Sequence, residues 1–179
     1  HVIIKASHAV LPGVGAFSNA MEELEKNGLA DTLREIVQKQ KPLLGICLGM
    51  QLLLDESEEF GKTMGLGLIS GKVVSIPALS KTGETLKSPH IGWGEIKPRE
   101  SRENWDGTAL DVISENDTVY FNHSFMAIPN NIQNVIAEND FGGHNIPSVI
   151  SNGPIIACQF HPEKSGQAGL KILRRFCEY

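Results

Sequence analysis

Short apolar runs separated by helical segments dominate the first third of the chain. Ala9-Val10-Leu11 reads as a strand that enters a tight loop, and Leu43 to Ile46 is a second run of the buried-strand type. The leucine-rich segment after Ile46, as far as Leu54, reads as a helix. Strands and helices that alternate at these lengths predict βαβ units and a largely parallel sheet.

The other helices are identified by their caps and their spacing. Ser18 is the expected N-cap of the first helix, and Gly28 its end. A second helix, with apolar residues at helical spacing, closes at Pro42. The last helix is expected to begin at Ser165 as its cap. Its predicted buried face consists of Leu170, Leu173, Phe176 and Cys177.

The middle of the chain has a different pattern. From Gly71 to Phe121, short β-like runs alternate with proline, glycine and polar turns, which predicts antiparallel additions to the same domain. Strands return at Val135 to Ala137 and at Ile155 to Phe160. We therefore predict one α/β domain over residues 1–179, with a central, mostly parallel sheet flanked by helices and a smaller antiparallel addition.

Composition narrows the class of protein. The 179 residues are 41% hydrophobic and carry a net charge of −5, which fits a single well-packed domain. Lysine and arginine are dispersed, so neither nucleic acid nor a membrane surface is an expected partner. No stretch approaches the roughly 20 consecutive apolar residues of a bilayer span, and no secretory signal is apparent. Three cysteines favour a reducing, cytoplasmic environment over a disulfide framework.

Gly45-Ile46-Cys47-Leu48-Gly49 lies between a predicted buried strand and a predicted helix. This arrangement is typical of a nucleophile elbow, in which a strained turn lifts the central side chain above the edge of the sheet. A cysteine at a helix N-terminus is also expected to have a lowered pKa, because the helix dipole favours the thiolate. Cys47 is therefore the candidate nucleophile, and the alternative interpretation is a small buried core cysteine.

A nucleophilic cysteine needs a base. His161 follows the apolar strand that ends at Phe160, where α/β domains gather functional groups, and Glu163 comes two residues later as a possible orienting carboxylate. His123 is the main competitor, and the residues by themselves leave the choice open. Cys158 and Cys177 read as buried structural cysteines. The spacing of cysteine and histidine predicts no metal site, and no glycine loop of the phosphate-binding type is present.

Four segments resemble the glutaminase subunits of imidazole glycerol phosphate synthases, a family of class I glutamine amidotransferases. They are Leu11-Pro12-Gly13-Val14-Gly15-Ala16-Phe17, Leu44-Gly45-Ile46-Cys47-Leu48-Gly49-Met50-Gln51-Leu52-Leu53, Pro89-His90-Ile91-Gly92-Trp93 and Gln159-Phe160-His161-Pro162-Glu163-Lys164-Ser165-Gly166. The resemblance is collinear over essentially the whole chain. It implies the class I amidotransferase (flavodoxin-like) fold, with His161 as the base and Glu163 as its orienting group.

The resemblance also implies the remaining roles. Cys47 would attack the side-chain amide of L-glutamine, and no cofactor or metal would be needed. Backbone N–H groups would stabilise the oxyanion, and other residues would hold the substrate; together these are Gly13, Val14, Gly15, Leu48, Gln51, Glu59, Ser124 and Phe125. Ammonia would pass to a (β/α)8-barrel synthase subunit in a heterodimer, and Trp93 and Lys164 would lie on the face that meets it. The isolated subunit is expected to be nearly idle.

Three departures from the family pattern stand out. The sequence starts at His1 and lacks the family's initial strand and helix, so we expect an N-terminally incomplete domain. Gly94 replaces the usual asparagine, and Asn122 and Phe125 replace the commoner valine and tyrosine. Two alternatives therefore stay open beside histidine biosynthesis: a paralogous glutaminase that serves surface-polysaccharide synthesis, and a non-catalytic scaffold. A thiol hydrolase of the same fold would leave the segment from Pro89 to Trp93 unexplained.

Overall fold

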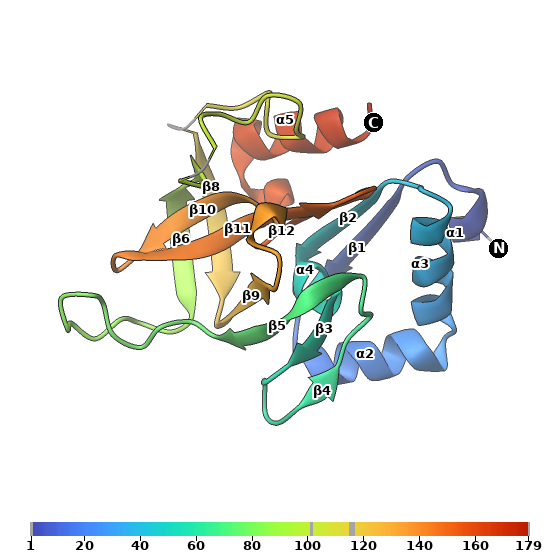
Figure 1. The fold of residues 1–179 in the computed structure, drawn as a ribbon, viewed down its shortest axis with the longest axis horizontal. Helices are drawn as coiled ribbons and strands as arrows, with labels where there is room; N and C mark the ends of the chain where they lie inside the picture. The colour runs from blue at the N-terminus through green and yellow to red at the C-terminus, as the bar shows by residue number, and fades with distance from the viewer. Residues whose placement is uncertain (1, 101, 115–116, 179) are drawn as a thin grey trace.

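The computed structural model describes residues 2–100, 102–114 and 117–178, so His1 lies outside the described residues. Its main sheet has six strands in the order β1-β2-β12-β11-β10-β7 (Figure 1). The strands span Ala9–Gly13, Leu43–Cys47, Ile155–Cys158, His144–Asn152, Val135–Phe141 and Lys97–Pro98 in that order. β2 pairs in parallel with β1 and with β12, whereas the other three pairings are antiparallel. The predicted α/β architecture is confirmed, and the sheet is mixed.

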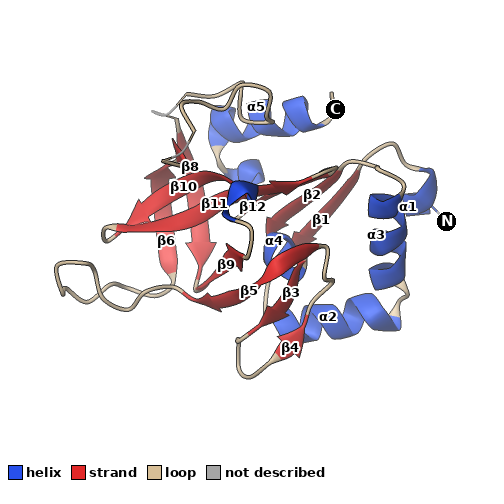
Figure 2. Ribbon diagram, in the orientation of Figure 1, coloured by secondary structure: helices blue, strands red, loops and turns tan. Residues whose placement is uncertain are grey.

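Two smaller sheets flank the main one, as Figure 2 shows. The first has the order β4-β3-β5-β9, with strands Thr63–Met64, Leu54–Ser57, Ile69–Ser75 and Phe125–Pro129. The second pairs β6, His90–Glu95, with β8, Thr118–His123, in antiparallel register. β5 and β9 are also antiparallel. The prediction of antiparallel additions in the middle of the chain is therefore confirmed.

Helices cover both faces of the main sheet, and this explains the unbroken apolar run in β2. α2, Phe17–Lys26, and α3, Leu29–Gln38, pack on one face, in a cluster that includes Leu43 of β2. α5, Gly166–Phe176, packs on the other face with Leu44. Because successive strand residues point to opposite faces, a strand buried on both sides is apolar throughout. The remaining helical elements are α1 (Val2–Lys5), α4 (Leu48–Leu52), η1 (Ile132–Asn134) and η2 (Pro162–Lys164).

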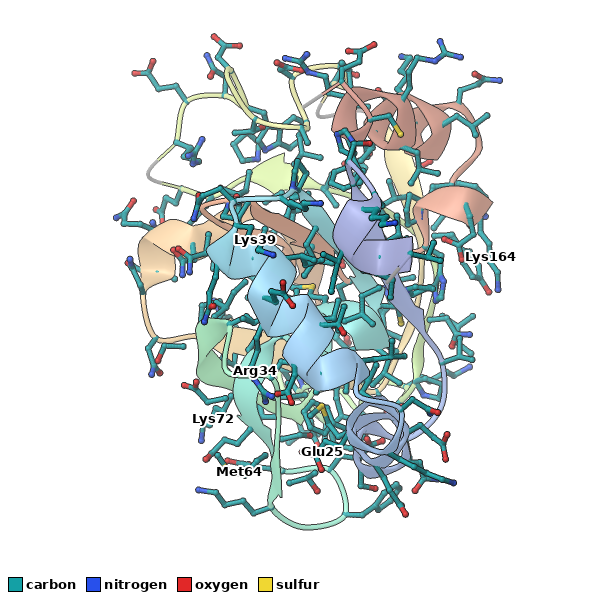
Figure 3. The ribbon with its side chains drawn as sticks, turned by 90° about the vertical axis from the view of Figure 1, so that its right-hand side faces the viewer. Glu25, Arg34, Lys39, Met64, Lys72 and Lys164 are labelled. Carbon is teal, nitrogen blue, oxygen red and sulfur yellow. The ribbon has the colours of Figure 1, made fainter. Side chains whose placement is uncertain are left out.

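The outer face of α3 is charged, and Figure 3 shows Arg34 and Lys39 on it, away from the core. Arg34 pairs with Asp31 at 3.0 Å, and Lys39 pairs with Glu35. These pairs join residues three and four apart on a solvent-exposed helix surface, where each contributes only a few tenths of a kcal/mol. The stability of α3 therefore comes mainly from its buried side, which carries Leu33 and Ile36.

Several local predictions are wrong. Ser18 lies inside α2, whose N-cap is Ala16, whereas Ser165 occupies the predicted N-cap position of α5 but makes no cap hydrogen bond with its side chain. The helix after Cys47 ends at Leu52, and Leu54 begins strand β3. Leucine-rich sequence favours a helix, but here pairing with β5 and β4 overrides that preference.

The buried face of α5 also differs from the prediction. Leu170 is 53% exposed and Cys177 is exposed, whereas Leu173 is partly buried. The fully packed positions are Ala168, Gly169, Ile172 and Phe176. The core-facing stripe repeats every four residues from Ala168, so it is displaced from the predicted one; only Phe176 is fully buried in both, and Leu173 packs beside it.

Candidate active site

The carboxyl ends of three adjacent parallel strands meet at one edge of the main sheet. The loop after β1, Cys47 at the end of β2, and the segment from Gln159 to His161 after β12 all lie there. Open α/β sheets place their binding sites at this edge. A cleft of about 370 Å³ opens at it. Its lining residues are Val14, Gly15, Cys47, Leu48, Gln51, Glu59, Phe60, Pro89, Asn122, His123, Ser124, Phe125, His161 and Lys164.

Cys47 has the strained backbone of a nucleophile elbow, with φ at 53° and ψ at −109°. Such a conformation is costly for a residue with a side chain and persists only where the surroundings enforce it. Two glycines allow α4 to pack closely against the sheet. A Cβ on Gly49 would lie 1.8 Å from the carbonyl oxygen of Leu11, and one on Gly45 would lie 2.9 Å from Leu53. The glycine spacing around Cys47 is thus a packing requirement, and the predicted elbow is present.

The thiol of Cys47 is buried, and burial raises its pKa to about 11. The backbone N–H of Leu48 and the side chain of Gln159 oppose this rise, and Lys164 opposes it weakly, whereas the charge of Glu163 adds to it. The prediction of a lowered pKa is therefore wrong for this chain. Desolvation outweighs the dipole because α4 has only five residues and the sulfur lies away from water.

His161 is held on both its backbone and its ring. Its N–H donates to the carbonyl of Tyr120 at 2.9 Å, and the hydroxyl of Ser165 donates to its carbonyl at 2.6 Å. Nδ1 lies 2.8 Å from Oε1 of Glu163. A carboxylate only accepts, so Nδ1 carries a proton and the lone pair of the neutral ring is on Nε2. This tautomer is the one that a general base needs.

His123 lies in the same cleft, but its ring is occupied at both nitrogens. Nδ1 lies 2.9 Å from the carbonyl of Phe125, and Nε2 lies 3.2 Å from Nδ1 of His90. Burial lowers the pKa of His123 to about 4, and the backbone bond to Phe125 only partly offsets this. His123 therefore lacks the free lone pair that His161 has.

Most of the predicted site residues line the cleft, and three lie outside its lining. Gly13 packs beneath it, where an added Cβ would lie 3.2 Å from Cβ of Leu48. Glu163 reaches the cleft through His161. Trp93 is 58% exposed on β6, which excludes core packing for it. Lys164 lies on η2 with its side chain directed outward (Figure 3).

Sequence reasoning missed several residues at the site. Phe60 lines the cleft and Gln159 contacts the sulfur of Cys47, whereas the sequence singles out Pro89 and Asn122, which also line it, only as part of a family segment and as a departure from the family pattern. The only available signal for Gln159 was its place two residues before His161 in the same segment. Phe60 has a positive φ of 52° and is 90% exposed, a conformation that sequence does not reveal.

Two features are absent from the described residues. No group of three or more histidine, cysteine or acidic side chains there is placed to hold a metal ion. None of the described helices combines the length and the apolar character that crossing a bilayer requires.

Comparisons with known proteins agree with this geometry. The family described as "Glutamine amidotransferase class-I" matches residues 6–178. Solved structures with low sequence identity share the fold. PurLQS from Thermotoga maritima superposes with a TM-score of 0.68 at 17% identity, over 97% of this chain and 79% of that one. The glutaminase domain of Trypanosoma brucei CTPS, with bound acivicin, gives 0.61 at 16% identity, over 99% and 73%.

Closer relatives are imidazole glycerol phosphate synthase HisH subunits. The one from Legionella pneumophila is 44% identical over 176 residues, which cover 98% of this chain and 83% of the relative. Those of Geobacillus thermodenitrificans and Streptococcus sanguinis are 46% and 45% identical. The first match covers 93% of this chain and 75% of the relative, and the second covers 99% and 80%. The chain therefore belongs to the class I glutamine amidotransferases, within the family of the imidazole glycerol phosphate synthase HisH subunits.

Proposed function

We propose that this chain is the glutaminase subunit of an imidazole glycerol phosphate synthase, and that it supplies ammonia for histidine biosynthesis. The observation that carries the proposal is the meeting of Cys47, His161 and Glu163 at one sheet edge, in a chain about 45% identical to HisH subunits along its length. The reaction converts L-glutamine and water into glutamate and ammonia.

Catalysis would use Cys47 as nucleophile and His161 as base. His161 Nε2 takes the thiol proton as Sγ bonds to the amide carbon of glutamine, which avoids a free thiolate in a buried site. The tetrahedral intermediate collapses, the C–N bond breaks, and His161 returns the proton to the leaving ammonia. Water then hydrolyses the thioester to glutamate with His161 again as base. Glu163 holds the ring and stabilises the imidazolium between these steps.

The oxyanion needs donors at the position where charge develops. We assign the N–H of Leu48, directly after the nucleophile, and an N–H of the loop Gly13-Val14-Gly15. Gly15 has a φ of 98°, a conformation that glycine adopts readily, so the peptide plane beside it can rotate at little cost. This loop is therefore suited to turn a donor toward the oxyanion or away from it.

Glutamine would be held by Gln51, Glu59 and the backbone of Ser124 and Phe125, with the carboxylate of Glu59 facing the α-ammonium group. Glu59 already accepts the N–H of Phe17 through Oε2 at 2.6 Å, which leaves Oε1 for the substrate. Gln51 donates both hydrogens of Nε2 within the protein, so it can contact glutamine only as an acceptor, through Oε1.

The partner would be a (β/α)8-barrel cyclase subunit that receives the ammonia, docked over the cleft on the face that carries Trp93 and Lys164. Trp93 is an exposed aromatic side chain of the kind that anchors interfaces, and Lys164 supplies a charge at the rim. We assign no cofactor to this half-reaction, because the thiol and the imidazole carry it.

The test is glutamate release by the chain together with a histidine-pathway barrel subunit, and formation of imidazole glycerol phosphate from glutamine. Wild type should support both reactions, and Cys47→Ala neither, although added ammonium should restore product formation by the barrel. Glutamate release that supports only a barrel from surface-polysaccharide synthesis would favour the paralogous glutaminase instead. If no barrel subunit elicits glutamate release, the result would favour the non-catalytic scaffold.

A further inference from the structure

Two buried glutamine side chains connect the backbone of the glutamine site to the sulfur of Cys47. Gln51 Nε2 lies 3.0 Å from the carbonyl oxygen of Phe125 and 3.1 Å from Oε1 of Gln159. Gln159 Nε2 lies 3.7 Å from Sγ of Cys47. Gln51 is 5% exposed and Gln159 is fully buried, so water does not compete for these bonds. The linked residues come from distant parts of the chain: Gln51 lies on α4, Phe125 begins β9, and Gln159 lies in the loop after β12.

The direction of this chain of hydrogen bonds is set at the Phe125 carbonyl. A carbonyl oxygen can only accept, so Gln51 must present its NH2 group to it. The second hydrogen of that NH2 group then points to Gln159, so Gln159 must accept it with Oε1. The remaining NH2 group of Gln159 is left toward Cys47. A flipped Gln159 would set two NH2 groups against each other and leave a buried donor unpaired, which costs about 1–3 kcal/mol.

A second set of hydrogen bonds, from His123 and His90, fixes the carbonyl of Phe125. His123 donates to it from Nδ1 at 2.9 Å, and the Nε2 of His123 accepts from Nδ1 of His90 at 3.2 Å. The ring of His90 stacks on Phe121, with centroids 4.9 Å apart. An oxygen with two lone pairs can accept from both His123 and Gln51. His123 therefore supports the carbonyl of Phe125 and does not act as the base.

We infer that Gln159 is the side-chain donor that stabilises the Cys47 thiolate, and that Gln51 is the positioning residue that keeps Gln159 in its donor orientation. The inference rests on the proposed role of Cys47 as nucleophile. A donor of this kind acts on the sulfur whenever negative charge develops there, as the proton leaves during attack and again when the thioester breaks.

The surroundings of the sulfur explain why a neutral donor is suited to this place. Burial opposes ionisation of Cys47, and the charge of Glu163 opposes it further. Lys164 is the cation that favours the thiolate, and its contribution is the smallest of those acting on Cys47. The other titratable groups that face this region are His161 and His123 in the cleft and the buried Cys158. A hydrogen-bond donor stabilises the thiolate without placing another charge in the buried site.

The experiment measures alkylation of Cys47 in the full chain without glutamine or partner. The background carries Cys177→Ser, since Cys177 is exposed, and mass spectrometry identifies the modified residue. For wild type, the rate should rise about tenfold per pH unit between pH 7 and 10, because the thiolate is the reactive form and the pKa lies above that range. Gln159→Met keeps the length of the side chain and removes the donor. It should lower the rate about tenfold at every pH in this range.

Two further variants test the positioning role and guard against a folding defect. Gln51→Met leaves Gln159 in place but frees its amide to turn, so a smaller decrease is expected. Gln133→Met, at an exposed position, is the matched control and should leave the rate unchanged. Each variant is checked by thermal unfolding. An unchanged rate in Gln51→Met would overturn the positioning role of Gln51. If Gln159→Met does not fold, Gln159→Glu tests the donor role instead, because it also removes the NH2 group; a rate equal to that of wild type would overturn that role.

Access to the sulfur is separated from its ionisation by two reagents of different size, iodoacetamide and N-ethylmaleimide. A change in ionisation lowers both rates by the same factor, whereas a change in access affects the larger reagent more. Equal rates for wild type and Gln159→Met with both reagents would overturn the inference and leave the glutaminase proposal intact. Conversely, glutamine hydrolysis by Cys47→Ala would remove the nucleophile role and leave the measured ionisation unaffected.

Discussion

At the scale of single residues, the site pairs a thiol that resists ionisation with an imidazole that is fixed for proton transfer. Burial holds the pKa of Cys47 at about 11, so at neutral pH the resting nucleophile is the thiol. The bond from His161 to Glu163 presents the opposite ring nitrogen as acceptor. In the proposed mechanism, deprotonation therefore accompanies attack on the substrate.

The first prediction concerns the three cysteines. Cys47→Ala should abolish glutamate release, whereas Cys158→Ala and Cys177→Ala should retain it. Cys158 is buried in β12, and its loss should lower the free energy of unfolding by about 1 kcal/mol; the exposed Cys177 should change it by less than about 0.5 kcal/mol. A glutamine-like electrophile should label Cys47 alone. Glutamate release at the wild-type rate by Cys47→Ala would end the assignment.

The second prediction ranks the histidines. His161→Ala should lower kcat by about 10²–10⁴-fold, since it removes the acid–base group. Glu163→Gln should cost less, because the ring keeps its place but loses stabilisation as a cation. His123→Ala should be milder than His161→Ala and should raise KM more than it lowers kcat, since His123 supports the Phe125 backbone. A larger kcat loss in His123→Ala than in His161→Ala would reverse the assignment of the base.

At the scale of elements, side chains from distant segments fix the helix ends that border the site. Glu59 accepts the first N–H of α2 from across the cleft, 42 positions along the chain. Ser165 accepts the N–H of Tyr120 at 2.9 Å and donates to the carbonyl of His161, so it joins β8 to the segment of the base. These bonds tie α2 to Glu59, and β8 to the segment of His161, at the edge of the cleft.

The third prediction tests the end of α2. Ser18→Ala should change the free energy of unfolding by less than about 0.5 kcal/mol, because the hydroxyl makes no cap bond. Glu59→Ala should lower it by about 1 kcal/mol, the usual value for loss of a cap, and should also raise KM for glutamine. Chemical denaturation of both variants measures the difference. A larger loss of stability in Ser18→Ala would restore the serine as the cap.

At the scale of the whole molecule, strand β6 links the proposed partner face to the base. Trp93 contacts Tyr120 across the β6–β8 pair, with ring centroids 6.0 Å apart, and the carbonyl of Tyr120 accepts the N–H of His161. A partner that binds Trp93 thus acts on an element in direct contact with the site. Coupling of this kind is reciprocal, so glutamine should also strengthen binding of the partner.

The fourth prediction is that the isolated chain is nearly idle and that the barrel subunit raises glutamate release by about 10²–10³-fold, the effect of completing an oxyanion hole. Trp93→Ala should weaken partner binding by at least about tenfold, as expected for a central aromatic anchor. Val2→Ala is the matched control: Val2 is 85% exposed on α1, at the opposite end of the molecule in Figure 1. Equal rates for the isolated chain and the complex would exclude the switch.

The sequence by itself determined the parts of this protein that depend on local order. The glycines around Cys47 allow close packing of α4, the apolar run of β2 is typical of a strand buried on both faces, and the place of His161 after β12 brings it to the same sheet edge. The elbow and the parallel half of the sheet were therefore predictable, whereas the choice of His161 over His123 as base came only from the family resemblance. Each signal lies within a few residues of the feature that it specifies.

Only the tertiary structure decided the ionisation of Cys47, the orientation of Gln159, the antiparallel half of the sheet and the true partner of the first N–H of α2. The helix dipole suggested a low pKa, but the surrounding core removed the solvent that a thiolate needs. Serine is a residue type favoured at N-caps, which suggested Ser18. In the fold, the carboxylate of Glu59 accepts the first N–H of α2 instead. Each of these properties depends on atoms that the fold brings together from distant segments, and short-range sequence patterns carry no record of desolvation or of long-range hydrogen bonds.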